Sequence, residues 1–348
     1  MKKSFYHFIR VVLGIYNRFY FNTFRVVGRE NIPQDGVVLF SPNHQNAFMD
    51  PLLVGTTCQK SVYSLTRSDV FGGPLQWFLD AMQTLPIYRI RDGYGQLKKN
   101  DAVFERCFAL LEEKKHLMMF SEGRHHPEYY LLQLSRGSSR LALSAQLRTP
   151  DTPVYLQPVG LNYGNHFHAR HNCVVVYGKA LDLRDYLEGY KQSAAQGINA
   201  VRNDLQNAME DCLWIPKNEG NYSEKKLLIN WKNTKFAFDD LKMRLAQRPT
   251  SLAPAKKEKK FIEQLLVHAL AFPNLPIHVA LFFIRKQFKD PVFHGSVNYL
   301  GGLVVFMSWW ALTVGIATTS MGIIYGTGWF LTSIASLYLR QYLIVRNL

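Results

Sequence analysis

Residues 41–51 read Ser-Pro-Asn-His-Gln-Asn-Ala-Phe-Met-Asp-Pro and directly follow the apolar run Val-Val-Leu-Phe at 37–40. A short β-prone run that breaks at Pro42 and continues into helix-prone sequence predicts a strand-to-helix junction. Proteins of the α/β class place functional residues at such junctions. The imidazole of His44 titrates near neutral pH, so it can take a proton from a hydroxyl group while Asp50 fixes its tautomer. His44 and Asp50 are therefore candidate catalytic residues, and the assignment depends on the rest of the chain.

The alternation of β-prone and helix-prone runs continues from about residue 36 to residue 185. We expect strands near 37–40, 61–65, 117–120, 154–159 and 173–177, and helices near 51–58, 74–82, 95–114 and 136–147. This alternation predicts an α/β fold with a mostly parallel central sheet flanked by helices. The candidate functional residues fall at strand ends, as expected for a site at the edge of a sheet.

Three further stretches follow the first one in a fixed order. They are Leu-Pro-Ile-Tyr-Arg at 85–89, Phe-Ser-Glu-Gly-Arg-His at 120–125 and Gln-Pro-Val-Gly-Leu-Asn-Tyr at 157–163. With residues 41–51 they resemble, in order and spacing, the four motif blocks of the phospholipid/glycerol acyltransferase family. That family includes glycerol-3-phosphate and lysophosphatidate acyltransferases. The resemblance covers roughly residues 30–185.

The blocks depart from the commonest family pattern at two places. Five residues separate His44 from Asp50 instead of four, which is similar to a branch that includes some glycerol-3-phosphate acyltransferases. One extra residue rotates a helical position by about 100°, so the turn after His44 must absorb it if the two side chains are to meet. In the third block, Ser121 replaces a proline, Arg124 occupies a variable position and His125 stands where an arginine is expected.

The resemblance implies a role for each site residue. His44 is the general base and Asp50 its orienting carboxylate. A guanidinium binds phosphate in bidentate fashion, so Arg89 is the first candidate for recognising an acceptor phosphate. The other implied substrate-binding residues are Glu122, which accepts from an acceptor hydroxyl, Gly123, which admits a ligand close to the backbone, and the cationic candidates Arg91, Arg124 and His125. Neither a cofactor nor a metal is implied.

A second cluster of ligand-type side chains follows the fourth block. His166, His168, His171 and Cys173 are the residue types that bind zinc. They fall, however, in what should be a polar loop between two strands, so we do not assign a metal site. The four cysteines of the chain are widely scattered and predict reduced, buried thiols without a disulfide framework.

Composition indicates an anionic partner. Lys and Arg number 41 against 26 Asp and Glu, for a formal net charge of +15, and 47% of the residues are hydrophobic, which excludes a disordered chain. A strongly basic protein binds polyanions, meaning nucleic acid or an anionic lipid surface. Because an uncharged apolar run closes the chain, we expect a membrane and no nucleic acid.

That run extends from residue 291 to residue 339 without Asp, Glu, Lys or Arg. It exceeds the roughly 20 residues of one span, so we expect two transmembrane helices with a turn near 318–328. Basic residues flank both ends of the run and the turn carries none, which places both ends and the catalytic domain on the cytoplasmic face. Residues 265–284 contain two prolines and predict an interfacial or broken helix.

Four regions are expected. Residues 1–30 form an N-terminal amphipathic helix in the membrane interface, although a helix packed on the core of the domain gives the same pattern. Residues 31–185 form the acyltransferase domain, residues 186–260 a polar helical region with a basic linker, and residues 261–348 the C-terminal membrane region.

These observations predict a membrane-bound O-acyltransferase of glycerophospholipid biosynthesis. The resemblance implies acyl-CoA or acyl carrier protein as donor, and glycerol-3-phosphate or a lysophospholipid as acceptor. One alternative is an enzyme specific for lysophosphatidate. Another is a non-catalytic, membrane-anchored lipid-binding protein that keeps the fold without the reaction.

Overall fold

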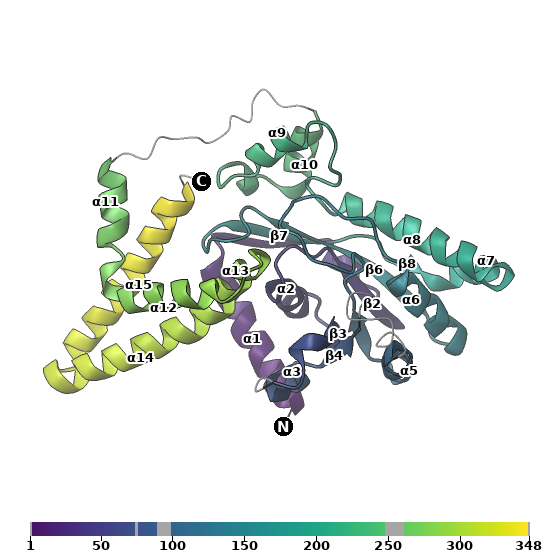
Figure 1. Ribbon diagram of the computed structural model, residues 1–348, viewed down its shortest axis with the longest axis horizontal. Helices are drawn as coiled ribbons and strands as arrows, with labels where there is room; N and C mark the ends of the chain where they lie inside the picture. The colour runs from purple at the N-terminus through teal and green to yellow at the C-terminus, as the bar shows by residue number, and fades with distance from the viewer. Residues whose placement is uncertain (1, 74–75, 89–98, 248–260, 347–348) are drawn as a thin grey trace.

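The computed structural model describes residues 2–73, 76–88, 99–247 and 261–346. Within them, one sheet has the strand order β1-β7-β6-β2-β5-β3-β4, with β8 beside β6 (Figure 1). The strands are β1 (Thr23–Val27), β2 (Val37–Pro42), β3 (Val62–Arg67), β4 (Thr84–Ile87), β5 (His116–Met118), β6 (Val154–Tyr163), β7 (Asn172–Tyr177) and β8 (Leu181–Asp182).

Most neighbouring strands are parallel. The pairs β2–β5, β2–β6, β3–β4 and β3–β5 run in one direction, whereas β7 and β8 are antiparallel to β6 and β1 is parallel to β7. The predicted α/β fold with a mostly parallel sheet is therefore confirmed. All five predicted strands are present, and β1, β4 and β8 are additional. Strand β1 lies within residues 1–30, where the sequence pattern predicts a helix.

Helices cover both faces of the sheet. Because side chains alternate along each strand, the two faces of β2 pack against different clusters. Val37 and Leu39 of β2 face an apolar cluster with the helices α5 (Lys99–Glu112), α6 (Gly137–Arg148) and α8 (Ala194–Asp211). Val38 and Phe40 face a second cluster with α1 (Lys2–Tyr20) and α2 (Met49–Thr57). The central strand β2 is thus buried on both sides, and the turn at its carboxyl end has a rigid base.

Shorter helices complete the sheet domain. A third apolar cluster covers Val174 and Val176 of β7 with residues from α9 (Tyr222–Leu228) and α10 (Phe238–Ala246). The remaining short elements of this part are α3 (Gln76–Ala81), α7 (Leu187–Gln192), η1 (Arg29–Asn31), η2 (Ser68–Val70), η4 (Leu183–Tyr186) and η5 (Asn233–Lys235).

Helix α1 packs on the sheet domain through one side. Tyr6, Leu13 and Tyr20 are buried, and α1 contacts α2 and α3. The other side exposes four large apolar side chains at a helical spacing, Phe8, Val11, Ile15 and Phe19. The packed side agrees with the alternative of a helix packed on the core of the domain. The exposed side leaves an apolar surface.

The C-terminal part consists of α11 (Phe261–Ala269), η6 (Phe272–Asn274), α12 (Leu275–Lys286), α13 (Val292–Ser296), the π-helix η7 (Val297–Gly301), α14 (Gly302–Met321) and α15 (Ile323–Arg346). Helices α14 and α15 lie side by side and extend away from the sheet (Figure 1). The hairpin turn is at Gly322, whose φ of 98° lies in the region that glycine favours.

The expectation of two transmembrane helices in this hairpin is supported for one of the two helices. Among the described residues, one continuous helix, Val292–Met321, is long and apolar enough to cross a membrane. Helix α15 does not meet this criterion because Gly, Ser, Thr and Arg340 dilute its apolar residues. The helices Phe261–Ala269 and Phe272–Lys286 meet at 41° and together are a bent candidate span, in accord with a broken helix around Pro273 and Pro276.

Candidate active site

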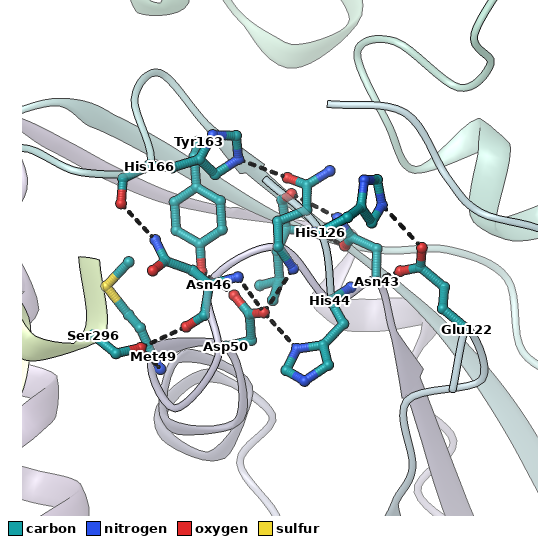
Figure 2. Close-up of polar contacts among 12 residues, drawn as sticks. Asn43, His44, Asn46, Met49, Asp50, Glu122, His126, Tyr163, His166 and Ser296 are labelled. Carbon is teal, nitrogen blue, oxygen red and sulfur yellow. Dashed lines mark hydrogen bonds and ion pairs between the residues drawn. The ribbon is translucent and has the colours of Figure 1, made fainter. Parts of the chain in front are cut away.

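The turn between β2 and α2 brings His44 and Asp50 together. His44 follows the end of β2, and Asp50 lies in the first turn of α2. Nδ1 of His44 is 2.8 Å from Oδ2 of Asp50, and Figure 2 shows the other ring nitrogen pointing away from the carboxylate. The Asp50 side chain is fully buried, whereas 17% of the His44 side chain is exposed. The histidine can therefore reach a ligand and the aspartate cannot.

Four donors surround the carboxylate of Asp50. Its Oδ2 accepts from Nδ1 of His44 and from the backbone N–H groups of Gln45 and Asn46, each at 2.8 Å. Its Oδ1 accepts from the hydroxyl of Tyr163 at 2.6 Å. Burial, together with the neighbouring Asp50, raises the pKa of Tyr163 well above its usual value, so the tyrosine remains a donor. Asp50 therefore holds the proton of His44 on Nδ1 and leaves a lone pair on Nε2.

The extra residue between His44 and Asp50 is absorbed at Ala47. Its φ of 38° lies outside the ordinary right-handed and extended regions, so the chain reverses there and brings Asp50 back beneath His44. The other end of the turn is fixed by Asn43, which donates to the carbonyl of Leu161 at 3.1 Å and accepts from its N–H at 2.6 Å. These contacts define the turn from both sides.

Glu122 binds the backbone of the same turn. Its Oε1 accepts from the N–H of His44 at 2.7 Å, and its Oε2 accepts from the N–H of Leu132 at 2.9 Å and lies 3.1 Å from Nε2 of His126 (Figure 2). The side chain is fully buried. Both oxygens of Glu122 are thus hydrogen-bonded within the protein, and one of them holds the backbone N–H of His44. Gly123, with a φ of 71°, forms the turn beside it.

The cationic candidates are placed differently from one another. His125 lies 5.5 Å from His44 between ring centroids, and its Nε2 is 2.8 Å from Oδ2 of Asp290. Burial lowers the pKa of His125, although the bond to Asp290 opposes this effect. Arg124 is exposed. Arg89 and Arg91 lie outside the described residues.

Two contacts at this site were not expected from the sequence. Tyr163 belongs to the fourth motif block, and its spacing of two from Leu161 on β6 places both on the face of the sheet that carries α2. Alternation could therefore have placed Tyr163 near Asp50. Ser296 contacts the turn from the C-terminal part of the chain, and no local pattern indicates a contact over 250 positions.

In the loop after β6, His166 and His171 form hydrogen bonds with other groups of the protein. Nε2 of His166 donates to Oε1 of Gln45 at 3.1 Å, and Nδ1 of His171 donates to the carbonyl of Asn172 at 2.9 Å. Burial lowers the pKa of both histidines to about 3. Within the described part of the chain, no three His, Cys, Asp or Glu side chains are arranged to hold a metal ion. All four cysteines are free and buried.

An apolar cavity begins beside the catalytic turn. Phe48, Pro51 and Leu52 form the end near Asp50, and residues of α1, α3, β3 and β4 line the rest. The space between these residues, including the open solvent at its edge, is about 710 Å³. Its lining is almost wholly apolar, so it suits a hydrocarbon chain.

Comparison with known proteins gives a family model, a similar sequence and a similar solved structure. Residues 23–161 match the family model described as Acyltransferase. Over 126 residues the chain is 25% identical to glycerol-3-phosphate O-acyltransferase 1 of Saccharomyces cerevisiae, and the match covers 34% of this chain and 17% of that protein. The crystal structure of the 1-acyl-sn-glycerophosphate acyltransferase PlsC of Thermotoga maritima aligns with a TM-score of 0.43 at 16% identity, covering 60% of this chain and 78% of PlsC. These matches support the phospholipid/glycerol acyltransferase family for residues 23–161, the part of the chain that the family model covers.

Proposed function

We propose that this protein transfers a fatty acyl group from a thioester to a hydroxyl group of a glycerolipid precursor. The observation that carries this proposal is the His44–Asp50 pair, in which a buried, four-fold bonded carboxylate fixes the tautomer of a partly exposed imidazole. This arrangement is that of a general base which operates near neutral pH. The Acyltransferase family model that residues 23–161 match supports the same reaction class.

In the proposed reaction, Nε2 of His44 takes the proton of the acceptor hydroxyl while the oxygen attacks the thioester carbonyl. Asp50 stabilises the imidazolium that forms. When the tetrahedral intermediate collapses, the carbon–sulfur bond breaks and the thiolate receives the proton from His44. The products are the ester and the free thiol, and His44 returns to its starting state.

The apolar cavity is the proposed site for the acyl chain. Its lining includes Phe48 and Pro51, which flank the segment that carries Asp50, so we propose that a chain inserted there directs its thioester toward His44. The polar reaction centre and the apolar chain then occupy adjoining regions. Acyl-CoA and acyl carrier protein both present such a thioester.

We propose glycerol-3-phosphate as the preferred acceptor, with a lysophospholipid as the alternative. The five-residue spacing between His44 and Asp50 and the name of the yeast relative support this choice. Arg89 remains the proposed phosphate ligand, with Arg91, Arg124 and His125 as secondary candidates, because an acceptor phosphate requires cationic partners.

Membrane attachment through the C-terminal part completes the proposal. Helix α14 has 20 residues, or about 30 Å at 1.5 Å per residue, which equals the thickness of the hydrocarbon layer. Lys286 and Lys289 precede it, so we propose that the sheet domain lies on the cytoplasmic face. The exposed side of α1 supplies a second apolar contact.

The test is a matrix of acyl-transfer assays with the full-length protein in detergent. Labelled glycerol-3-phosphate and lysophosphatidate are each offered with acyl-CoA and with acyl carrier protein. Transfer to glycerol-3-phosphate at a kcat/KM above that for lysophosphatidate is expected. Preference for lysophosphatidate would support the alternative acceptor, and absence of transfer with every pair would contradict the proposed reaction.

A further inference from the structure

The first residues of the C-terminal apolar helix contact the turn that carries His44 and Asp50. The hydroxyl of Ser296 donates to the carbonyl of Asn46 at 2.6 Å and accepts from the N–H of Met49 at 2.9 Å (Figure 2). Ser296 is 2% exposed. Its hydroxyl thus bridges the two ends of the Ala47–Phe48 reversal, where the extra residue of the turn is absorbed.

The neighbouring Gly295 shows how closely this helix approaches the turn. A Cβ atom at this position would lie 2.2 Å from Oδ1 of Asn46 and 2.2 Å from the carbonyl oxygen of His166. Asn46 itself donates to that carbonyl at 2.9 Å. Any larger residue at 295 would therefore displace helix α13, or else the backbone at His166 and the side chain of Asn46.

Two further contacts join the same parts of the chain. The carboxylate of Asp290 pairs with His125 at 2.8 Å. The ring of Phe293 lies 5.3 Å from that of His125 and 5.7 Å from that of Phe48. Residues 290–296, which we call the docking segment, therefore contact both sides of the candidate site.

We propose that Ser296 is a positioning residue for the His44–Asp50 pair, so that the C-terminal membrane region completes the active site as well as anchoring the protein. Because Asp50 follows Met49 directly, and Asn46 donates to Asp50, a shift of either bonded residue moves the carboxylate away from His44. Ser296 directly precedes the π-helix η7, which continues into α14. Docking of the membrane helix on the sheet domain and the order of the catalytic turn are therefore coupled. The kinetic part of this inference rests on the proposed function.

The first test is Ser296→Ala in the full-length protein, with Ser308→Ala as matched control. Ser308 bonds only within its own helix, to the carbonyl of Val304, and is exposed. Misplacement of a reacting group by about 1 Å costs on the order of 100-fold in rate, so we expect kcat of Ser296→Ala to fall roughly 10- to 100-fold with KM little changed. Ser308→Ala should retain native kinetics.

A second readout is independent of catalysis. Hydrogen–deuterium exchange by mass spectrometry should be faster in Ser296→Ala for peptides that contain residues 45–49, and unchanged for peptides of β3 and α6. If the native protein shows no acyl transfer, the proposed reaction fails, but the exchange experiment still decides whether Ser296 orders the turn.

Gly295→Ala disturbs the contact in another way, by pushing the helix from the turn. It should reproduce the local rise in exchange and the loss of kcat, whereas Gly315→Ala in α14 should not, because a Cβ atom there meets nothing within 4 Å. Native kcat together with native exchange at residues 45–49 in Ser296→Ala would overturn the proposal. A rise in exchange that extends over β3 and α6 would show a merely structural contact and would also overturn it.

Discussion

The buried carboxylate of Asp50 is stabilised by hydrogen bonds. Removing a carboxylate from water is costly unless hydrogen bonds replace the lost hydration. Two backbone N–H groups, a tyrosine hydroxyl and an imidazole N–H provide them at distances between 2.6 and 2.8 Å. The same bonds fix the geometry of His44, so the stability of the turn and the orientation of the base have one cause.

Asp50→Asn tests the charge separately from the geometry. An amide can still accept from the N–H of His44 but cannot stabilise the imidazolium, so we expect kcat to fall by roughly 100-fold or more with KM little changed. Asp35→Asn is the matched control, because Asp35 also accepts from a tyrosine hydroxyl, that of Tyr155 at 3.1 Å, but on the surface. A native kcat in Asp50→Asn would contradict the role of the carboxylate.

At the scale of single residues, the sequence predicted the His44–Asp50 pair but not its support. The pair was predictable because both residues lie within one short motif. Glu122 was placed correctly in the neighbourhood, yet its oxygens face backbone N–H groups, and that orientation depends on the path of residues 126–132. Contacts such as that of Ser296 depend on tertiary packing and leave no local pattern.

At the scale of elements, hydrophobic alternation predicted the five central strands and the four helices between them. In each of these runs, the hydrophobic residues recur with a single period, that of a strand or that of a helix. Strands β4 and β8 are short, with four and two residues, and provide too few positions for a period to be recognised. Strand β1 continues the apolar composition of α1, so composition alone did not separate them.

The cavity next to α2 leads to a prediction at this scale. Gly55 lines the cavity, and a Cβ atom there meets nothing within 4 Å, so a larger side chain would extend into the empty space. Gly55→Leu should shift the preference toward shorter acyl chains, measured as kcat/KM over a series of acyl donors. Gly189→Leu in α7 is the control, since it is equally unobstructed but lies outside the cavity lining. An unchanged chain-length profile in Gly55→Leu would show that the acyl chain lies elsewhere.

At the scale of the whole molecule, the C-terminal helices are tied to one another as well as to the sheet. Asn274, buried at the break between α11 and α12, donates to the carbonyl of Ser333 at 2.8 Å and accepts from the indole N–H of Trp310 at 3.0 Å. The bent segment therefore joins both helices of the hairpin. Hydropathy predicted the apolar region as a whole, whereas α15 carries more small polar residues than α14 and packs against it along the hairpin.

Stability should depend on pH through buried histidines, and among the described residues the pKa is lowered furthest for His166 and His171. Burial lowers the pKa of His166 and His171 to about 3, so both are neutral in the folded protein at pH 7. The unfolded chain takes up these protons near pH 6.5, so this contribution to stability is complete above pH 6.5 and is lost as the pH falls toward 3. From pH 6.5 to pH 5 the loss is roughly 2 kcal/mol per histidine.

The measurement is the unfolding midpoint of the full-length protein in detergent at pH 7, 6 and 5. This window lies above the usual pKa of carboxylates, so the histidines dominate it. His166→Gln should reduce the pH dependence because one titrating group is removed. A midpoint that stays constant from pH 7 to pH 5 would show that these histidines are not buried in the neutral form.

The most direct test of the central claim is the single-turnover rate of acyl transfer for the native protein, His44→Ala and His7→Ala. His7 is an exposed histidine of α1, far along the chain from the catalytic turn, and serves as the control for loss of an imidazole. General-base catalysis contributes on the order of 100- to 10,000-fold. We predict that His44→Ala remains folded but loses at least about 100-fold in rate, and that the rate of His7→Ala remains native. A folded His44→Ala that transfers acyl groups at the native rate would contradict the account.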